Sequence, residues 1–192
     1  AAKKRLNALV AKTFATAVPN VMAETKRLEC CGNLSNLTCF EIFGLDVEMD
    51  EHLVPHLLEV NVAPEIMVRR GDLMSMQVVG GLASDMFRVI GVRSKPDDET
   101  RRPRSRKDLP KAFCEILKDC SEDEQYQLLE LENQLERSRT TMFKRVFPCD
   151  DKDVSNAVES ILKLASRGDS LHQLPRRQSL LKRWVALSQH RP

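Results

Sequence analysis

The sequence has no long apolar run and almost no excess of charge. Its apolar stretches are short and interrupted, far below the roughly 20 residues needed to cross a bilayer, so we expect no membrane partner. The 30 Lys+Arg and 28 Asp+Glu leave a net charge of +2, too small to indicate nucleic acid as a partner. The first five residues include Lys3, Lys4 and Arg5, but no signal-peptide core follows them. We therefore expect an intracellular protein.

Zinc-binding and nucleophile motifs are also missing. The six cysteines have irregular spacings and no CxxC pair, which favours reduced thiols over disulfides. A zinc site would have to combine Cys30, Cys31 and Cys39 with His52 and His56, a spacing atypical of such sites. No Ser/His/Asp or Cys/His arrangement has supporting motif context, so the sequence assigns no nucleophile.

Apolar periodicity predicts several amphipathic helices. The first covers about residues 5–22, and Pro19 is expected to perturb or end it. Ser121 with Glu124 forms the capping-box pattern at the start of another helix. Trp184 is compatible either with a membrane or partner contact or with packing on the body of the protein. The remaining helices are expected at residues 72–91, 112–117, 153–166 and 180–187.

Two apolar-rich runs predict an antiparallel hairpin. Residues 39–49 and 53–61 each have the composition of a strand, and residues 50–52 supply the turn. Pro55 is tolerated near the start of the second strand, where a missing donor matters least. Simple alternation places Glu59 and Asn61 on one face of that strand and turns Leu58 and Val60 toward the core.

Three polar residues of this hairpin are candidate metal ligands. The hairpin returns Asp46 to the neighbourhood of Glu59 and Asn61. Two carboxylates and an amide oxygen are hard donors of the kind that Mg²⁺ prefers, with further positions left for water and phosphate oxygens. A magnesium–nucleotide site is one interpretation. The alternative is a half-exposed hairpin whose polar face only contacts water.

The hairpin sequence resembles a known signature. Residues 39–46 read C-F-E-I-F-G-L-D, and residues 50–64 read D-E-H-L-V-P-H-L-L-E-V-N-V-A-P. This two-part pattern is similar to that of the tubulin tyrosine ligase-like enzymes, roughly C-F-E-L-x-G-F-D followed by L-x-P-W-L-L-E-V-N-x-S-P. The flanking residues 9–13 and 84–91 resemble the same family, and residues 129–136 and 143–148 resemble its glutamate-adding branch.

The resemblance implies an ATP- and Mg²⁺-dependent ligase. Asp46, Glu59 and Asn61 match the family's magnesium ligands around ATP, with Glu59 and Asn61 also in the catalytic role. The implied reaction activates a substrate carboxylate as an acyl phosphate, which the amino group of free glutamate attacks. The implied partners are the acidic tails of tubulin or microtubules and free glutamate. The implied location is the cytoplasm and cytoskeleton, including the cilium or basal body, and we expect a monomer.

Substrate contacts and activity are less well defined by the sequence. Arg69 and Arg70 follow the metal loop and are candidate substrate contacts or a surface pair. The family's aromatic residue before Leu57 is His56 here, and its S-P-S-L has become residues 63–66, A-P-E-I. We expect the upstream nucleotide lobe to have no room in this chain, so that the isolated polypeptide is inactive. The alternative function is a non-catalytic microtubule- or partner-binding module derived from the ligase scaffold.

These inferences predict an α+β fold, namely the carboxyl-terminal half of an ATP-grasp domain followed by a helical extension. Residues 1–92 would form the ATP-grasp part with the metal-binding hairpin. Residues 93–107, with seven basic residues and two prolines, would be a linker that can attract acidic tails. Residues 108–150 would form the helical extension, and residues 151–192 a helical or partly disordered tail.

Overall fold

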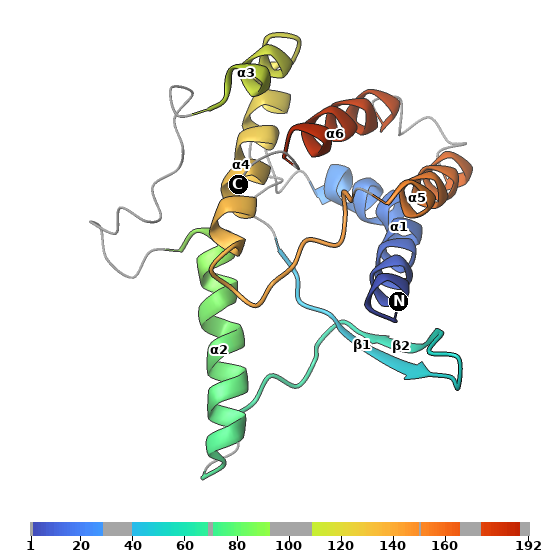
Figure 1. Ribbon diagram of the computed structural model, residues 1–192, viewed down its shortest axis with the longest axis vertical. Coiled ribbons are helices and arrows are strands. Elements are labelled where there is room, and N and C mark those ends of the chain that lie inside the picture. The colour runs from blue at the N-terminus through green and yellow to red at the C-terminus, as the bar shows by residue number, and fades with distance from the viewer. Residues whose placement is uncertain are drawn as a thin grey trace. The chain divides into compact units, whose positions relative to one another are not determined.

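The computed structural model describes residues 2–28, 40–68, 71–92, 109–149, 151–165 and 174–188. The chain is mixed α+β, with six helices and one two-stranded antiparallel sheet in the described ranges (Figure 1). None of the helices in those ranges is long and apolar enough to cross a membrane. The described residues divide into two compact units, which are interleaved along the chain.

The first unit is built around helix α1 (Ala2–Leu28) and helix α5 (Lys152–Ala165). Apolar residues spaced three or four apart give each helix one apolar stripe, and the two stripes pack together. Their buried core comprises Ala11, Ala15, Val154, Val158 and Leu162. At one end Lys4 pairs with the Asp151 carboxylate at 2.9 Å, so the polypeptide just before α5 is tied to the start of α1.

The same unit holds the hairpin of β1 (Gly44–Met49) and β2 (Pro55–Asn61), together with helix α6 (Leu174–Ser188). The hairpin lies beside α1 (Figure 1). The rings of Phe14 and Phe43 meet at a centroid distance of 5.1 Å. Lys182 of α6 pairs with Glu159 of α5 at 2.5 Å. Trp184 is fully buried, which favours the packing interpretation of this residue.

The second unit contains α2 (Leu73–Ile90), α3 (Lys111–Lys118) and α4 (Glu122–Ser138). Helix α2 contacts α4, and Arg137 joins them by donating to the Val89 carbonyl at 2.8 Å while pairing with Glu130 at 2.5 Å. The predicted capping box is confirmed, since Ser121 and Glu124 each accept the other's backbone N–H.

Several boundaries differ from the sequence-based expectations. Pro19 was expected to perturb or end the first helix, and the second alternative is wrong, because helix α1 continues through Pro19 to Leu28. Val18, one residue earlier, packs on the α1–α5 core. Strand β1 begins at Gly44 rather than residue 39, because its partner β2 ends at Asn61 and the chain bends away before Pro64. The basic segment 93–107 lies outside the described residues.

Candidate metal centre

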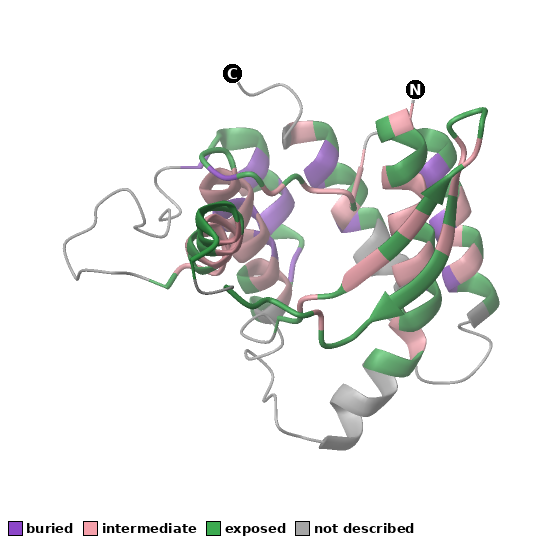
Figure 2. Cartoon of the chain, turned by 90° about the horizontal axis from the view of Figure 1, so that it is seen from below, coloured by how far each residue is buried: buried purple, intermediate pink, exposed green. Residues whose placement is uncertain are grey.

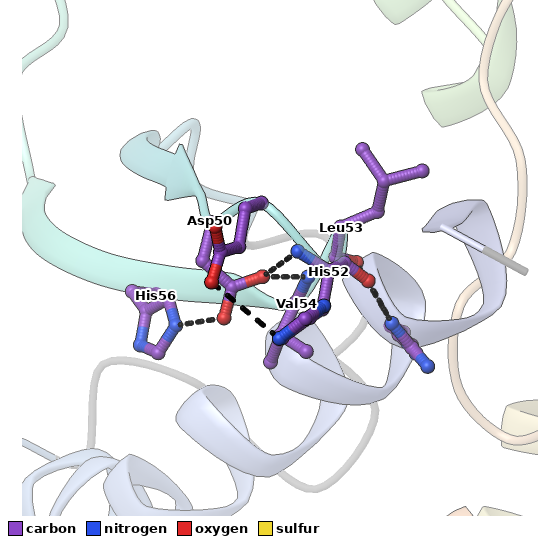
Figure 3. A network of polar contacts seen from close by, with 7 residues as sticks. Asp50, His52, Leu53, Val54 and His56 are labelled. Atoms are coloured by element: carbon purple, nitrogen blue, oxygen red, sulfur yellow. Dashed lines mark hydrogen bonds and ion pairs between the residues drawn. The ribbon is translucent and has the colours of Figure 1, made fainter.

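The turn between the two strands is built around the Asp50 side chain (Figure 3). Its Oδ1 accepts the backbone N–H groups of His52 at 2.9 Å and Val54 at 2.8 Å. Its Oδ2 lies 3.1 Å from Nε2 of His56. These contacts, above all the one with the Val54 N–H and then the one with His56, lower the pKa of Asp50 from its ordinary value. The carboxylate therefore organises the turn in its charged form.

The strand register brings two of the predicted ligands face to face. Asp46 of β1 pairs directly with Glu59 of β2, and Gly44 pairs with Asn61. Directly paired residues share a face and have Cβ atoms about 5 Å apart. All three predicted ligands therefore occupy one face of the hairpin. Each of them is exposed.

A β-bulge interrupts the alternation in β2. Val47 pairs with Leu57 while Asp46 pairs with Glu59, so Leu58 has no partner across the sheet. Because of the extra residue, the alternation of side chains between the two faces of β2 is reversed on one side of Leu58 relative to the other. One face carries Asp46 and Glu48 of β1 with His56, Glu59 and Asn61 of β2, and the other carries only apolar residues apart from the turn: Leu45, Val47, Met49, Pro55, Leu57 and Val60.

The expectation that Leu58 and Val60 face a core is wrong for this chain. Leu58 is 64% exposed because it is the bulged residue, and Val60 is 36% exposed near the open end of the hairpin. Leu45, Val47 and Leu57 are half-buried, and strand β2 contacts α1. Figure 2 shows the hairpin as a mixture of intermediate and exposed residues. The apolar face is thus covered along its middle, and the polar face is open to solvent.

The donor chemistry of the polar face fits a hard cation. The Asn61 side-chain amide donates its Nδ2 hydrogen to Oε1 of Glu59 at 3.0 Å, which leaves the Asn61 carbonyl oxygen available as an acceptor. Within the described ranges, no three His, Cys, Asp or Glu side chains converge as a complete metal site. Mg²⁺ commonly takes only one or two carboxylates from a protein and completes its octahedron with water and phosphate oxygens. Asp46 and Glu59, assisted by Asn61, meet that requirement.

Comparison with known proteins agrees with this hairpin signature. The family model described as "Tubulin-tyrosine ligase family" matches residues 2–102, which is more than half of the chain and includes the whole hairpin. The chain belongs to the tubulin-tyrosine ligase family. The assignment confirms the resemblance found in the sequence.

Relatives within this family are named as polyglutamylases. The chain is 31% identical over 135 residues to "Tubulin polyglutamylase ttll-4" of Caenorhabditis elegans, covering 57% of this chain and 22% of that protein. It is 39% identical over 54 residues to "Tubulin polyglutamylase TTLL5" of Homo sapiens, covering 28% of this chain and 4% of that protein. The chain thus spans less than a quarter of the length of either relative. No solved structure matches it.

Other residues considered in the sequence have different outcomes. Arg69 and Arg70 lie outside the described residues, as do Cys30, Cys31 and Cys39 of the zinc alternative. His56 was not predicted to share the ligand face of this tubulin-tyrosine ligase family hairpin. Plain alternation puts it on the opposite side from Glu59, and only the bulge reverses that. Two adjacent apolar residues, Leu57 and Leu58, interrupt the alternation in the sequence of β2, but this interruption does not by itself specify a bulge.

Proposed function

We propose that this chain carries the magnesium-binding hairpin of an ATP-dependent protein–glutamate ligase of the ATP-grasp type. The observation that supports the proposal is the direct pairing of Asp46 with Glu59, next to Asn61, in a chain that belongs to the tubulin-tyrosine ligase family. The named relatives are tubulin polyglutamylases, so we propose acidic tubulin tails as the acceptor and free glutamate as the donor. The working location would be the cytoplasmic cytoskeleton or cilium.

The hairpin would serve this reaction mainly by electrostatics and positioning. Asp46 and Glu59 would hold Mg²⁺ through carboxylate oxygens, and Asn61 through its carbonyl oxygen. The ion, when bound, would neutralise phosphate charge during transfer of the terminal phosphoryl group of ATP. The Asn61 amide steadies Glu59 through its hydrogen bond, which fixes the carboxylate before the ion arrives. Asn61 would also orient the terminal phosphate.

The sequence that follows the ligand strand supports a second candidate function. Glu65, an exposed carboxylate, stands close after the ligand strand within the altered segment A-P-E-I. Loss of two hydroxyls and gain of a negative charge disfavour phosphate binding at this loop. A non-catalytic module that binds microtubules or another acidic partner is therefore the alternative, with the basic residues 93–107 as its contact.

Titration with ATP distinguishes the two functions. We expect ATP to bind this chain weakly and only with Mg²⁺ present, and we expect Glu59→Gln to abolish that binding. Glu48→Gln is the matched control, because Glu48 is an exposed residue of the same face, paired with His56 rather than with a predicted ligand. Equal ATP binding with and without Mg²⁺, or equal effects of the two substitutions, would argue against the ligase.

Cosedimentation with microtubules completes the comparison. Tight binding that needs neither ATP nor Mg²⁺ and survives Glu59→Gln would favour the module. We also expect no glutamate transfer by the 192-residue chain alone. Transfer that disappears in Glu59→Gln would contradict that expectation while supporting the ligase chemistry.

A further inference from the structure

The hairpin turn is held by several hydrogen bonds that all involve Asp50. Asp50 donates its backbone N–H to the Val54 carbonyl at 3.1 Å and accepts the Leu53 N–H on its own carbonyl at 2.9 Å. Its side chain adds the contacts to His52, Val54 and His56. Asp50 thereby fixes both the loop from residue 50 to residue 54 and the side chain of His56, the residue of the polar face nearest the turn.

A helix outside the hairpin holds the same turn. Arg5 of α1 donates from Nη1 to the backbone carbonyls of His52 at 2.6 Å and Leu53 at 3.3 Å. Leu53 has φ +55°, a left-handed conformation that a branched side chain rarely adopts. The turn therefore keeps a conformation that local sequence preference does not favour, and the contacts from Asp50 and Arg5 are what oppose its relaxation.

The turn contributes to the position of the metal ligands together with the bulge at Leu58 and the contacts of the hairpin with α1. A slip of one residue in a hairpin moves every side chain to the other face. Burial normally prevents such a slip, but Asp46, Glu59 and Asn61 are exposed, and the apolar face is only half-buried. The turn therefore sets the register of the pairs next to it, Met49 with Pro55 to Val47 with Leu57, and the bulge at Leu58 then places Asp46 opposite Glu59.

We propose that Asp50 is a positioning residue for the metal centre, acting through the turn and its Arg5 contact to keep Asp46 opposite Glu59. The proposal rests on the proposed function, since it assumes that this face binds Mg²⁺. Asp50 itself stands at the far end of β1 from the ligand pair and is not proposed as a ligand. Its carboxylate is already engaged by two backbone N–H groups and His56.

The test compares three substitutions in the 192-residue chain by Mg²⁺ titration, followed in amide NMR spectra. We expect Asp50→Ala to weaken Mg²⁺ binding at least about 10-fold, the usual effect of losing a residue that orients metal ligands. Asp50→Asn keeps a side-chain oxygen for the two N–H groups, so we expect affinity within about 3-fold of the parent, which is rescue by the conservative variant. Glu51→Ala, a change at an exposed neighbour in the turn, is the control.

Cross-strand nuclear Overhauser contacts between Asp46 and Glu59 report the register independently. Normal Mg²⁺ affinity in Asp50→Ala would overturn the proposal. If Asp50→Ala loses the hairpin altogether, Asp50→Asn decides: retained register with retained affinity supports the positioning role, and retained register with lost affinity overturns it. If the parent chain shows the register but binds no Mg²⁺, the proposed function fails, and the positioning role fails with it.

Discussion

Replacing Val158 by alanine is predicted to destabilise the unit that carries the hairpin. The Val158 side chain is 2% exposed and packs in the α1–α5 core with Ala11 and Ala15. The substitution removes two methyl groups, worth about 0.8 kcal/mol each by transfer from water, and leaves a cavity that adds to this cost. We therefore expect a loss of about 2 kcal/mol in the free energy of unfolding, after correction for helix propensity.

A matched control supplies that correction. Val21 lies on α1 of the same unit and is 60% exposed, so Val21→Ala makes the same chemical change without removing buried contacts. Alanine favours a helix over valine by a few tenths of a kcal/mol. Urea unfolding, followed by fluorescence of the buried Trp184, measures both variants in one unit. Equal free energies of unfolding for the two variants would refute the packing of α5 on α1.

Three further predictions concern single residues. Asp50 and Asp151 have pKa values below the ordinary 3.8, so their contribution to stability is complete above the unfolded-state pKa and is lost as the pH falls through the lowered values. The urea midpoint of the parent should therefore drop more steeply below pH 4 than that of Asp151→Asn, and parallel curves would contradict this. Gly91 has φ +85°, so Gly91→Ala should lower the free energy of unfolding by about 1 kcal/mol. Gly80 lies within α2 and is open to solvent, so Gly80→Ala should raise it by about 0.5–1 kcal/mol, and changes of the same sign would be inconsistent with the left-handed cap. Ser121→Ala should cost about 1 kcal/mol in urea unfolding by removing the α4 cap, and no measurable loss would show that the cap is not formed in solution.

Local chemistry made parts of the fold predictable. Ser121 and Glu124 specify a helix start within four residues, and Asp72 with Gly91 brackets α2 between a side-chain cap and a left-handed glycine. The hairpin and its turn were predictable because strand composition changes sharply at Asp50. These features depend on neighbours in the sequence, so the sequence alone contains them.

Features that depend on distant contacts were not predictable in the same way. The core of Ala11 and Ala15 against Val158 joins residues from nearly opposite ends of the chain, and no periodicity indicates which stripes meet. Helix α1 persists through Pro19 in a region held by tertiary packing. The predicted domain boundaries at residues 92, 107 and 150 remain predictions. The two compact units each combine separate segments of the chain, and a boundary between sequential segments does not describe such units.

The candidate site also combines features that the sequence predicts with features that it does not. The residues Asp46, Glu59 and Asn61 could be selected from donor chemistry and from the family signature, and the register places them on one face. The side of the sheet on which His56 falls depends on the bulge at Leu58, a single-residue irregularity without a sequence rule. The roles of the ligands, and those of Arg69 and Arg70, remain predictions.

Paramagnetic Mn²⁺, used as a probe for Mg²⁺, would show whether the hairpin binds a metal ion and where. Bound at the proposed centre, Mn²⁺ would broaden amide resonances most strongly around Asp46, Glu59 and Asn61. We expect that excess Mg²⁺ reverses this broadening, that Glu59→Gln abolishes it and that Glu48→Gln preserves it. Broadening centred on another part of the chain, or equal loss in both variants, would contradict a metal centre built on the pairing of Asp46 with Glu59.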